Sequence, residues 1–144
     1  MSQEAVGKGG SRKRWVYTVL TAAIVAAGLF VRAPWAPLTP FVAKYAGGLL
    51  YAVMMFLLAA WALKSRSTQT VALVALALCW GTEFSQLIHT PELDDIRSTW
   101  LGHMVLGTWF SWGDVLTYGV GVLLAAIVEY EWHHSMQKGR INHR

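Results

Sequence analysis

The sequence predicts an all-α fold: a four-helix transmembrane bundle with a short re-entrant or interfacial helix between the third and fourth spans. Of the 144 residues, 55% are hydrophobic and only 14% are charged, against roughly 25% charged residues in an average globular domain. Four apolar runs approach the length of about 20 residues that a helix needs to cross a bilayer. Eight tryptophans lie mostly near the ends of these runs, as residues of the membrane interface do.

The first two expected spans contain no charged residue. Residues 15–31 lie between Arg14 and Arg32, and residues 46–63 form the second span. A cleaved signal peptide is the alternative for the first, but its apolar core is longer than that of a typical signal sequence. Between the two spans, a continuous helix is disfavoured by Pro34, Pro37 and Pro40.

The third and fourth expected spans contain acidic residues near their ends. Residues 70–88 form the third span and include Glu83. The fourth, residues 113–130, begins with Asp114 and ends at Glu129, so its uncharged middle is slightly short.

The loop before the fourth span becomes apolar again over residues 96–110. This stretch is too short to cross a bilayer, and Gly102 and Gly107 interrupt it. We expect either a re-entrant segment on the extracytoplasmic side or an amphipathic helix lying on the membrane surface.

Charge distribution predicts the domain organisation and the orientation. We expect a disordered cytoplasmic leader at residues 1–13, a membrane domain at residues 14–132 and a cytoplasmic tail at residues 133–144. Basic residues flanking spans are retained in the cytoplasm, so the bias places both termini there. Nine of the twelve Lys and Arg residues lie on that side, namely Lys8, Arg12, Lys13, Arg14, Lys64, Arg66, Lys138, Arg140 and Arg144, against Arg32, Lys44 and Arg97 on the other.

Polar residues within the spans indicate where a ligand would bind. A charged side chain in the middle of a membrane helix costs at least about 2.5–3.5 kcal/mol, so Glu83 needs partners, and Gln86 shares its helix face. Asp114 forms a capping-box pattern with Ser111, and the spacing puts Tyr118 on the face of Asp114. The alternative is that these groups only hold helices together.

Both polar faces point to the same extracytoplasmic end, where two loop residues also lie. The candidate ligand-binding set is Glu83, Gln86, Arg97, His103, Asp114 and Tyr118. We expect no metal and no cofactor, because the chain has no Gly-rich phosphate loop, no His-Glu-x-x-His and no Gly-x-Ser-x-Gly. The basic leader is explained by orientation, so we expect no nucleic-acid partner.

Several motifs follow one another along the chain: Phe41-Val42-Ala43-Lys44-Tyr45-Ala46-Gly47, Glu83-x-Ser85-Gln86, Leu93-Asp94-x-x-Arg97-x-Thr99-x-Leu101-Gly102, Leu106-Gly107 and Phe110-x-Trp112-x-Asp114-x-x-x-Tyr118-x-x-Gly121. This string of motifs resembles the bacterial domain-of-unknown-function 2809 family over about residues 28 to 130. The resemblance implies a small integral inner-membrane protein with no assigned activity. A looser resemblance, an intramembrane Glu-x-x-Gln followed by a later Asp, is to the VanZ-like proteins associated with glycopeptide resistance.

One position departs from the family pattern. The resemblance implies an acid after the glycine of the Lys-Tyr-x-Gly motif, where this chain has Gly48. The polar cluster then has one carboxylate fewer, which weighs against proton transfer or cation binding.

Two functional hypotheses follow, and the sequence assigns no enzyme activity. The first is an envelope membrane protein whose polar intramembrane cluster binds a lipid headgroup or another membrane protein. The alternative is a membrane enzyme or lipid-handling protein acting on a phosphorylated envelope precursor, with Glu83 or Asp114 as acid or base and Arg97 holding the phosphate. A transporter is disfavoured because no inverted repeat is visible.

Overall fold

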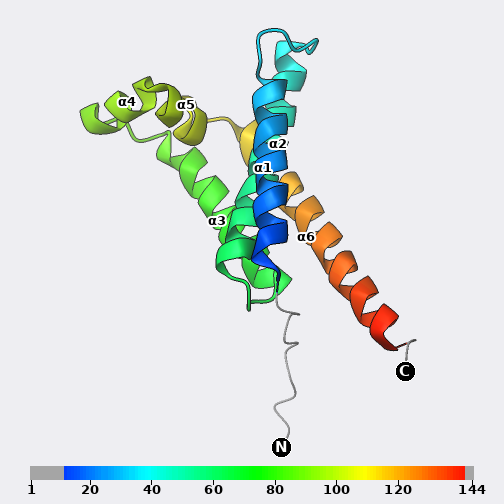
Figure 1. Cartoon of the computed structure of the whole chain (residues 1–144). Helices are drawn as coiled ribbons and strands as arrows, with labels where there is room; N and C mark the ends of the chain where they lie inside the picture. Colours follow the sequence, from blue (N-terminus) through cyan, green and yellow to red (C-terminus); the bar gives the residue numbers. More distant parts are fainter. Residues whose placement is uncertain (1–11, 142–144) are drawn as a thin grey trace, which may run out of the picture.

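The computed structural model describes residues 12–141, which fold into six α-helices and contain no β-strand. The predicted all-α class is confirmed. In Figure 1 the long helices lie side by side, and α1 begins at the same end of the molecule at which α6 finishes. In chain order the helices are α1 (Arg14–Val31), α2 (Pro40–Ala62), α3 (Thr68–Ser85), α4 (Pro91–Ser98), α5 (Trp100–Leu106) and α6 (Trp112–Ile141).

Four of these helices begin at a Ser or Thr residue that caps them. In each case the side-chain oxygen accepts a hydrogen bond from the backbone N–H three residues later, which satisfies one of the unpaired donors of the first turn. The caps are Thr39 for α2, Ser67 for α3, Thr90 for α4 and Thr99 for α5.

The second helix begins earlier than predicted. The sequence placed its start at residue 46, whereas α2 begins at Pro40. Proline is tolerated at the first helical position because its missing N–H would have no partner there, and Thr39 supplies the cap. As a result Lys44, expected in a loop, lies on the first turns of α2.

Helix α2 is the centre of the bundle. It packs against α1, α3 and α6, and α3 also packs against α6. Small side chains in the contact surfaces allow close approach, as is common between membrane helices. The fully or nearly fully buried core residues are Ala52, Phe56 and Ala60 of α2, Val71, Ala75 and Cys79 of α3, and Val122 of α6.

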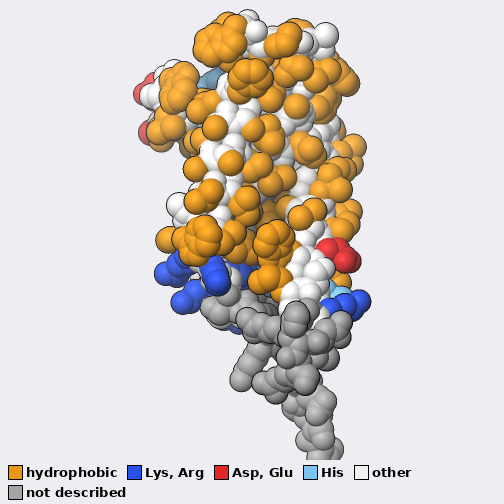
Figure 2. All heavy atoms as spheres, turned by 45° about the vertical axis from the view of Figure 1, so that its right-hand side comes forward, with side chains coloured by type: hydrophobic (Ala, Val, Ile, Leu, Met, Phe, Trp, Pro, Cys, Tyr) orange, Lys and Arg blue, Asp and Glu red, His pale blue; other side chains and the backbone are white. Residues whose placement is uncertain are grey.

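Large hydrophobic side chains cover the outside of the bundle. Figure 2 shows them over most of the visible helical surface, with Lys and Arg gathered at the lower end. The exposed residues include all eight tryptophans, among them Trp109, which is 84% exposed. An apolar exterior of this extent is expected of a protein surrounded by lipid.

Three helices are long and apolar enough to cross a membrane: α1, α2 and residues 112–138 of α6. They correspond to the first, second and fourth predicted spans. Helix α3, the third, is not among them. Its 18 residues include Gln69 near one end and Glu83 near the other, which lower its apolar content.

The last helix continues beyond the predicted end of the fourth span. The sequence placed that end at residue 130 and a separate tail from residue 133, but α6 is unbroken as far as Ile141. Its polar residues after Tyr130 include good helix formers such as Glu131 and Lys138, and no proline interrupts them.

The loop between α3 and α6 contains the two short helices. They pack against each other, and α5 also contacts α3; both lie to one side of the bundle in Figure 1. Helix α5 has seven residues, too few to cross a bilayer, and it exposes Trp100 and Leu101 at 71% and 64%. Helix α4 carries Glu92 and Asp94 in its first turn.

The closest approach of α2 and α6 gives a first prediction. A Cβ at Gly121 would lie 2.7 Å from Cβ of Ala52, whereas a Cβ at Gly119 would meet nothing within 4 Å. We expect Gly121→Ala to lower the free energy of unfolding in detergent by about 1–3 kcal/mol through overpacking. Gly119→Ala is the control and should be neutral or stabilising by about 0.5–1 kcal/mol, because alanine favours helix. Equal thermal melting of the two variants would contradict the packing described here.

Candidate functional site

Glu83 lies in the last turn of α3 and is 1% exposed. Its Oε1 accepts a 2.7 Å hydrogen bond from the backbone N–H of Ser111, the residue before α6. A carboxylate at this position satisfies an unpaired donor and meets the positive end of the α6 dipole. Glu83 therefore caps a helix that starts 29 residues later, and this bond joins the end of α3 to the start of α6.

Gln86 is the C-cap residue of α3 and is 5% exposed. Its Nε2 donates to the backbone oxygen of Leu106 at 2.8 Å and, at 3.4 Å, to Oε2 of Glu83. Its Oε1 is buried and has no hydrogen-bond partner among the described residues. Gly107 makes this approach possible: its φ is +65°, and a Cβ there would lie 2.6 Å from Gln86 Nε2.

Asp114 faces a lysine, not the residue that the capping-box pattern suggested. Its Oδ2 lies 3.6 Å from Nζ of Lys44, and the same Nζ donates to Oγ of Ser111 at 3.3 Å. No hydrogen bond of a capping box joins Ser111 and Asp114 in the described part of the chain, because the Ser111 N–H is bound to Glu83. The Lys44 side chain is half exposed, so the ion pair itself contributes little to stability.

A partly open cavity of about 500 Å³ lies between α2, α3, α5 and α6. Five of the six candidate residues line it: Glu83, Gln86, His103, Asp114 and Tyr118. The Tyr118 ring also packs against Tyr51, with centroids 5.6 Å apart. The volume falls within the range of roughly 300–1,000 Å³ typical of small-molecule sites.

Arg97, the sixth candidate, does not line this cavity. It is 4% exposed and donates to the backbone oxygens of Ser85 at 2.7 Å and Ile88 at 2.8 Å, with Asp94 Oδ1 at 3.3 Å. Carbonyl groups at the end of a helix lack partners, so Arg97 supplies donors to the end of α3 and fastens α4 to it.

Two cations that sequence analysis did not select do line the cavity: Arg32 and Lys44. Arg32 is the C-cap residue of α1, and a Cβ on Gly47 would lie 2.9 Å from its Nε, so its side chain rests on α2 beside Gly47. Lys44 is three residues before Gly47, on the same helix face. The available signal was that both lie at the predicted extracytoplasmic end of the bundle, which has only three of the twelve basic residues. Gly48, where the family resemblance implies an acid, also lines the cavity.

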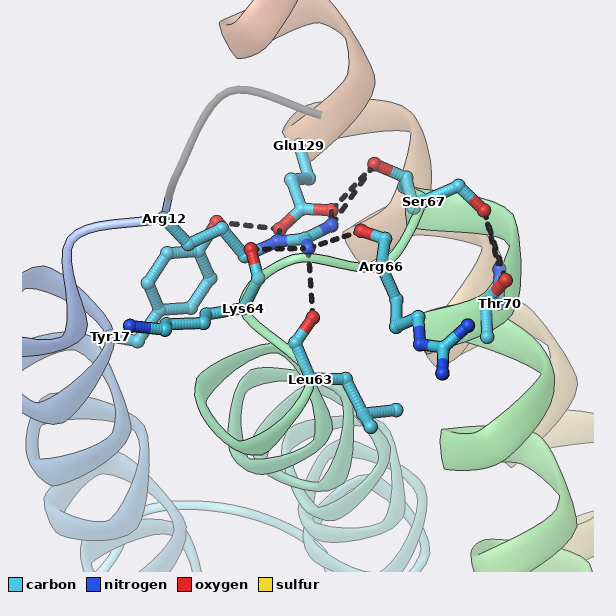
Figure 3. Close-up of polar contacts among 9 residues, drawn as sticks. Arg12, Tyr17, Leu63, Lys64, Arg66, Ser67, Thr70 and Glu129 are labelled. Atoms are coloured by element: carbon cyan, nitrogen blue, oxygen red, sulfur yellow. Dashed lines mark hydrogen bonds and ion pairs between the residues drawn. The ribbon is translucent and has the colours of Figure 1, made fainter. Parts of the chain in front are cut away.

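A second polar cluster lies at the opposite end of the bundle (Figure 3). Arg12 and Glu129 form a two-point ion pair, with Nε to Oε1 and Nη2 to Oε2 both at 2.8 Å. Tyr17 and Thr68 donate further hydrogen bonds to the Glu129 carboxylate, at 2.5 and 2.7 Å. The hydrogen bond to Glu129 raises the pKa of the Arg12 guanidinium, which keeps it charged.

The remaining donor group of Arg12 binds backbone oxygens of the α2–α3 connection. Nη1 lies 3.2 Å from the oxygen of Leu63 and 2.6 Å from that of Arg66. Sequence analysis placed Arg12 in a disordered leader, but it is 5% exposed; residues 1–11 of that leader lie outside the described residues. The cluster joins the start of α1, the α2–α3 connection and α6.

No group of three or more His, Cys, Asp and Glu side chains suited to a metal ion occurs in the part of the chain that the structure describes. A family model described as a protein of unknown function, DUF2809, matches residues 38–122. That range includes every residue lining the cavity except Arg32. No solved structure was found to match the chain.

The buried ion pair gives a second prediction. Removing one partner of such a pair leaves an uncompensated charge and typically costs 3–5 kcal/mol, so we expect Glu129→Gln to lower the free energy of unfolding in detergent by about 3 kcal/mol. Glu131→Gln, an exposed change on the same helix, is the control and should be neutral. If Glu129→Gln melts like the control, the cluster does not hold these elements together.

Proposed function

The chain belongs to the DUF2809 family, whose description names no activity, and we propose from its own residues that it is a four-span protein of the bacterial inner membrane that binds a lipid headgroup. The cavity that Arg32 and Lys44 line at the end opposite the termini is the observation that carries this proposal. Both termini are cytoplasmic in the arrangement proposed.

We infer that α3, the third predicted span, also crosses the membrane, because it is attached to α6 near both of its ends. Near its start, Thr68 donates to Glu129, and near its end Glu83 accepts from Ser111. Between these bonds α3 and α6 pack side by side. With a rise of about 1.5 Å per residue, the 18 residues of α3 extend about 27 Å, close to the hydrocarbon thickness of about 30 Å. Its polar residues are therefore near the two interfaces.

The case for the orientation rests on which basic side chains are neutralised. At the end where α1 begins, Lys13, Arg14, Lys64 and Arg66 are exposed. At the other end, Arg97 is buried, Lys44 lies beside Asp114, and Arg32 is exposed. The excess of exposed positive charge at the first end favours the cytoplasm.

A lipid headgroup is favoured as the ligand because of the depth at which the cavity would lie in the membrane. Trp109 lines it and is 84% exposed, and Trp100 on the adjacent α5 is 71% exposed. Tryptophans gather at the depth of the headgroups, so the cavity opens where headgroups are found. Arg32 and Lys44 offer charge-assisted hydrogen bonds to a phosphate there.

Binding is favoured over the enzyme alternative because two of the groups assigned to catalysis have structural partners. Arg97, expected to hold a phosphate, donates to the backbone at the end of α3. Glu83, expected to act as acid or base, accepts from the Ser111 N–H.

The third prediction tests the four spans. In intact bacterial cells, cysteine introduced as Asp95→Cys in α4 should react with a membrane-impermeant maleimide, and Ser65→Cys in the α2–α3 connection should not. Both positions are exposed, and the native Cys79 is buried, so the background is low. A C-terminal green fluorescent protein should be fluorescent, because it stays in the cytoplasm. If α3 does not cross the membrane, the cysteine of Asp95→Cys does not react with the maleimide, and the C-terminal fusion is not fluorescent because it lies outside the cytoplasm.

The fourth prediction tests headgroup binding. After detergent exchange, native mass spectrometry of the wild type should show one retained phospholipid. We expect Arg32→Ala combined with Lys44→Ala to reduce this retention about tenfold, the effect of losing about 1.5 kcal/mol of charge-assisted hydrogen bonding. Arg14→Ala combined with Arg66→Ala, at the other end of the bundle, is the matched control. Equal retention in both double variants would refute the proposal.

A further inference from the structure

The cavity lining carries charged groups of both signs. Arg32 and Lys44 are its cations, and the Arg32 guanidinium rests beside Gly47. Glu83 of α3 and Asp114 of α6 are its acidic residues, and Asp114 Oδ2 lies 3.6 Å from Lys44 Nζ. The formal charges of these four residues cancel. A ligand of net negative charge is attracted by the two cations and repelled by the two acidic residues.

Gln86 favours a ligand that can donate a hydrogen bond. It is 5% exposed and lines the cavity. Its Nε2 donates to Leu106 and Glu83, whereas its Oε1 has no partner in the described structure. A buried acceptor without a donor is costly, and a bound molecule that supplies the donor recovers that cost. A phosphate diester has only acceptor oxygens, so a phosphate alone does not satisfy Gln86.

We propose that the cavity selects a phosphate ester that bears a primary ammonium group, the chemistry of a phosphatidylethanolamine headgroup. The phosphate lies against Arg32 and Lys44. The ammonium group lies against Asp114 and donates to Gln86 Oε1. Because Lys44 and Asp114 lie next to each other, the phosphate and the ammonium group of one headgroup each meet the opposite charge. The N–H donors of the ammonium group distinguish it from choline, which has the same net charge and no N–H.

This selectivity rests on the headgroup binding proposed above, and a lipid series separates the two. The full-length protein is reconstituted in nanodiscs that contain equal amounts of phosphatidylethanolamine, phosphatidylcholine and phosphatidylglycerol with the same acyl chains, and retained lipid is measured by native mass spectrometry. We expect phosphatidylethanolamine to be retained about tenfold more than phosphatidylcholine, as for one buried acceptor left unpaired. Phosphatidylglycerol, which has hydroxyl donors, should be retained less because its net negative charge is repelled by Glu83 and Asp114.

Two variants locate the selectivity. Gln86→Met keeps the length of the side chain and removes the acceptor, so the preference for ethanolamine over choline should disappear. Asp114→Asn keeps the shape of the side chain and removes one negative charge, so the retention of phosphatidylglycerol relative to phosphatidylethanolamine should rise. Thr18→Val, on the lipid-facing side of α1 and far from the cavity, is the control and should keep the wild-type ranking.

The wild-type ranking decides the outcome even if a variant fails to fold. Equal retention of all three lipids, still dependent on Arg32 and Lys44, overturns the selectivity and leaves headgroup binding intact. If the wild type retains no more lipid than the Arg32→Ala, Lys44→Ala double variant, both headgroup binding and its selectivity are overturned. A competition with millimolar glycerophosphoethanolamine shows which part of the lipid is needed. If it displaces phosphatidylethanolamine, the free phosphate ester is sufficient for binding; if it does not, the acyl chains are needed too. Each result supports the headgroup chemistry.

Discussion

A carboxylate inside an apolar helical bundle must have partners, and this constraint determines how the helices of this protein are aligned. Glu83 and Glu129 are both buried, near opposite ends of the α3–α6 pair. Glu83 binds the N–H of Ser111, and Glu129 binds Arg12, Tyr17 and Thr68. Sliding α3 along α6 by one turn would break bonds at both ends. The register of the bundle, and with it the shape of the cavity, therefore depends on two acidic residues.

Much of the fold is predictable because hydrophobicity and helix periodicity are local properties. The apolar runs predict the long helices, and the three-residue spacing of Glu83 and Gln86 puts both on one face, where both now line the cavity. Helix ends are less predictable. Proline predicted a loop as far as residue 45, but Pro40 is compatible with a helix start once Thr39 caps it. The same proline can end one helix or begin another, and only the surrounding cap decides.

The partners of charged residues are where prediction from sequence falls short. Arg12 precedes an apolar helix, a pattern that orientation alone explains, and Arg97 was expected to hold a phosphate. Both are instead buried among backbone oxygens. Arg32 and Lys44 also flank spans, and they line the cavity. Spacing along one helix shows which face a side chain occupies, but the nearest carboxylate or carbonyl belongs to another helix. Its identity depends on tertiary packing, which periodicity does not contain.

The ion pair between Arg12 and Glu129 also bears on how the protein is made. The two residues are 117 positions apart, and they join the first helix to the last. At about 5–20 residues per second, a ribosome needs roughly 6–23 s to pass from one codon to the other. Throughout that interval the guanidinium has no counter-charge, because Glu129 has not been synthesised. The Arg12–Glu129 pair, and with it the contact between the start of α1 and α6, therefore forms only after nearly the whole chain has been made.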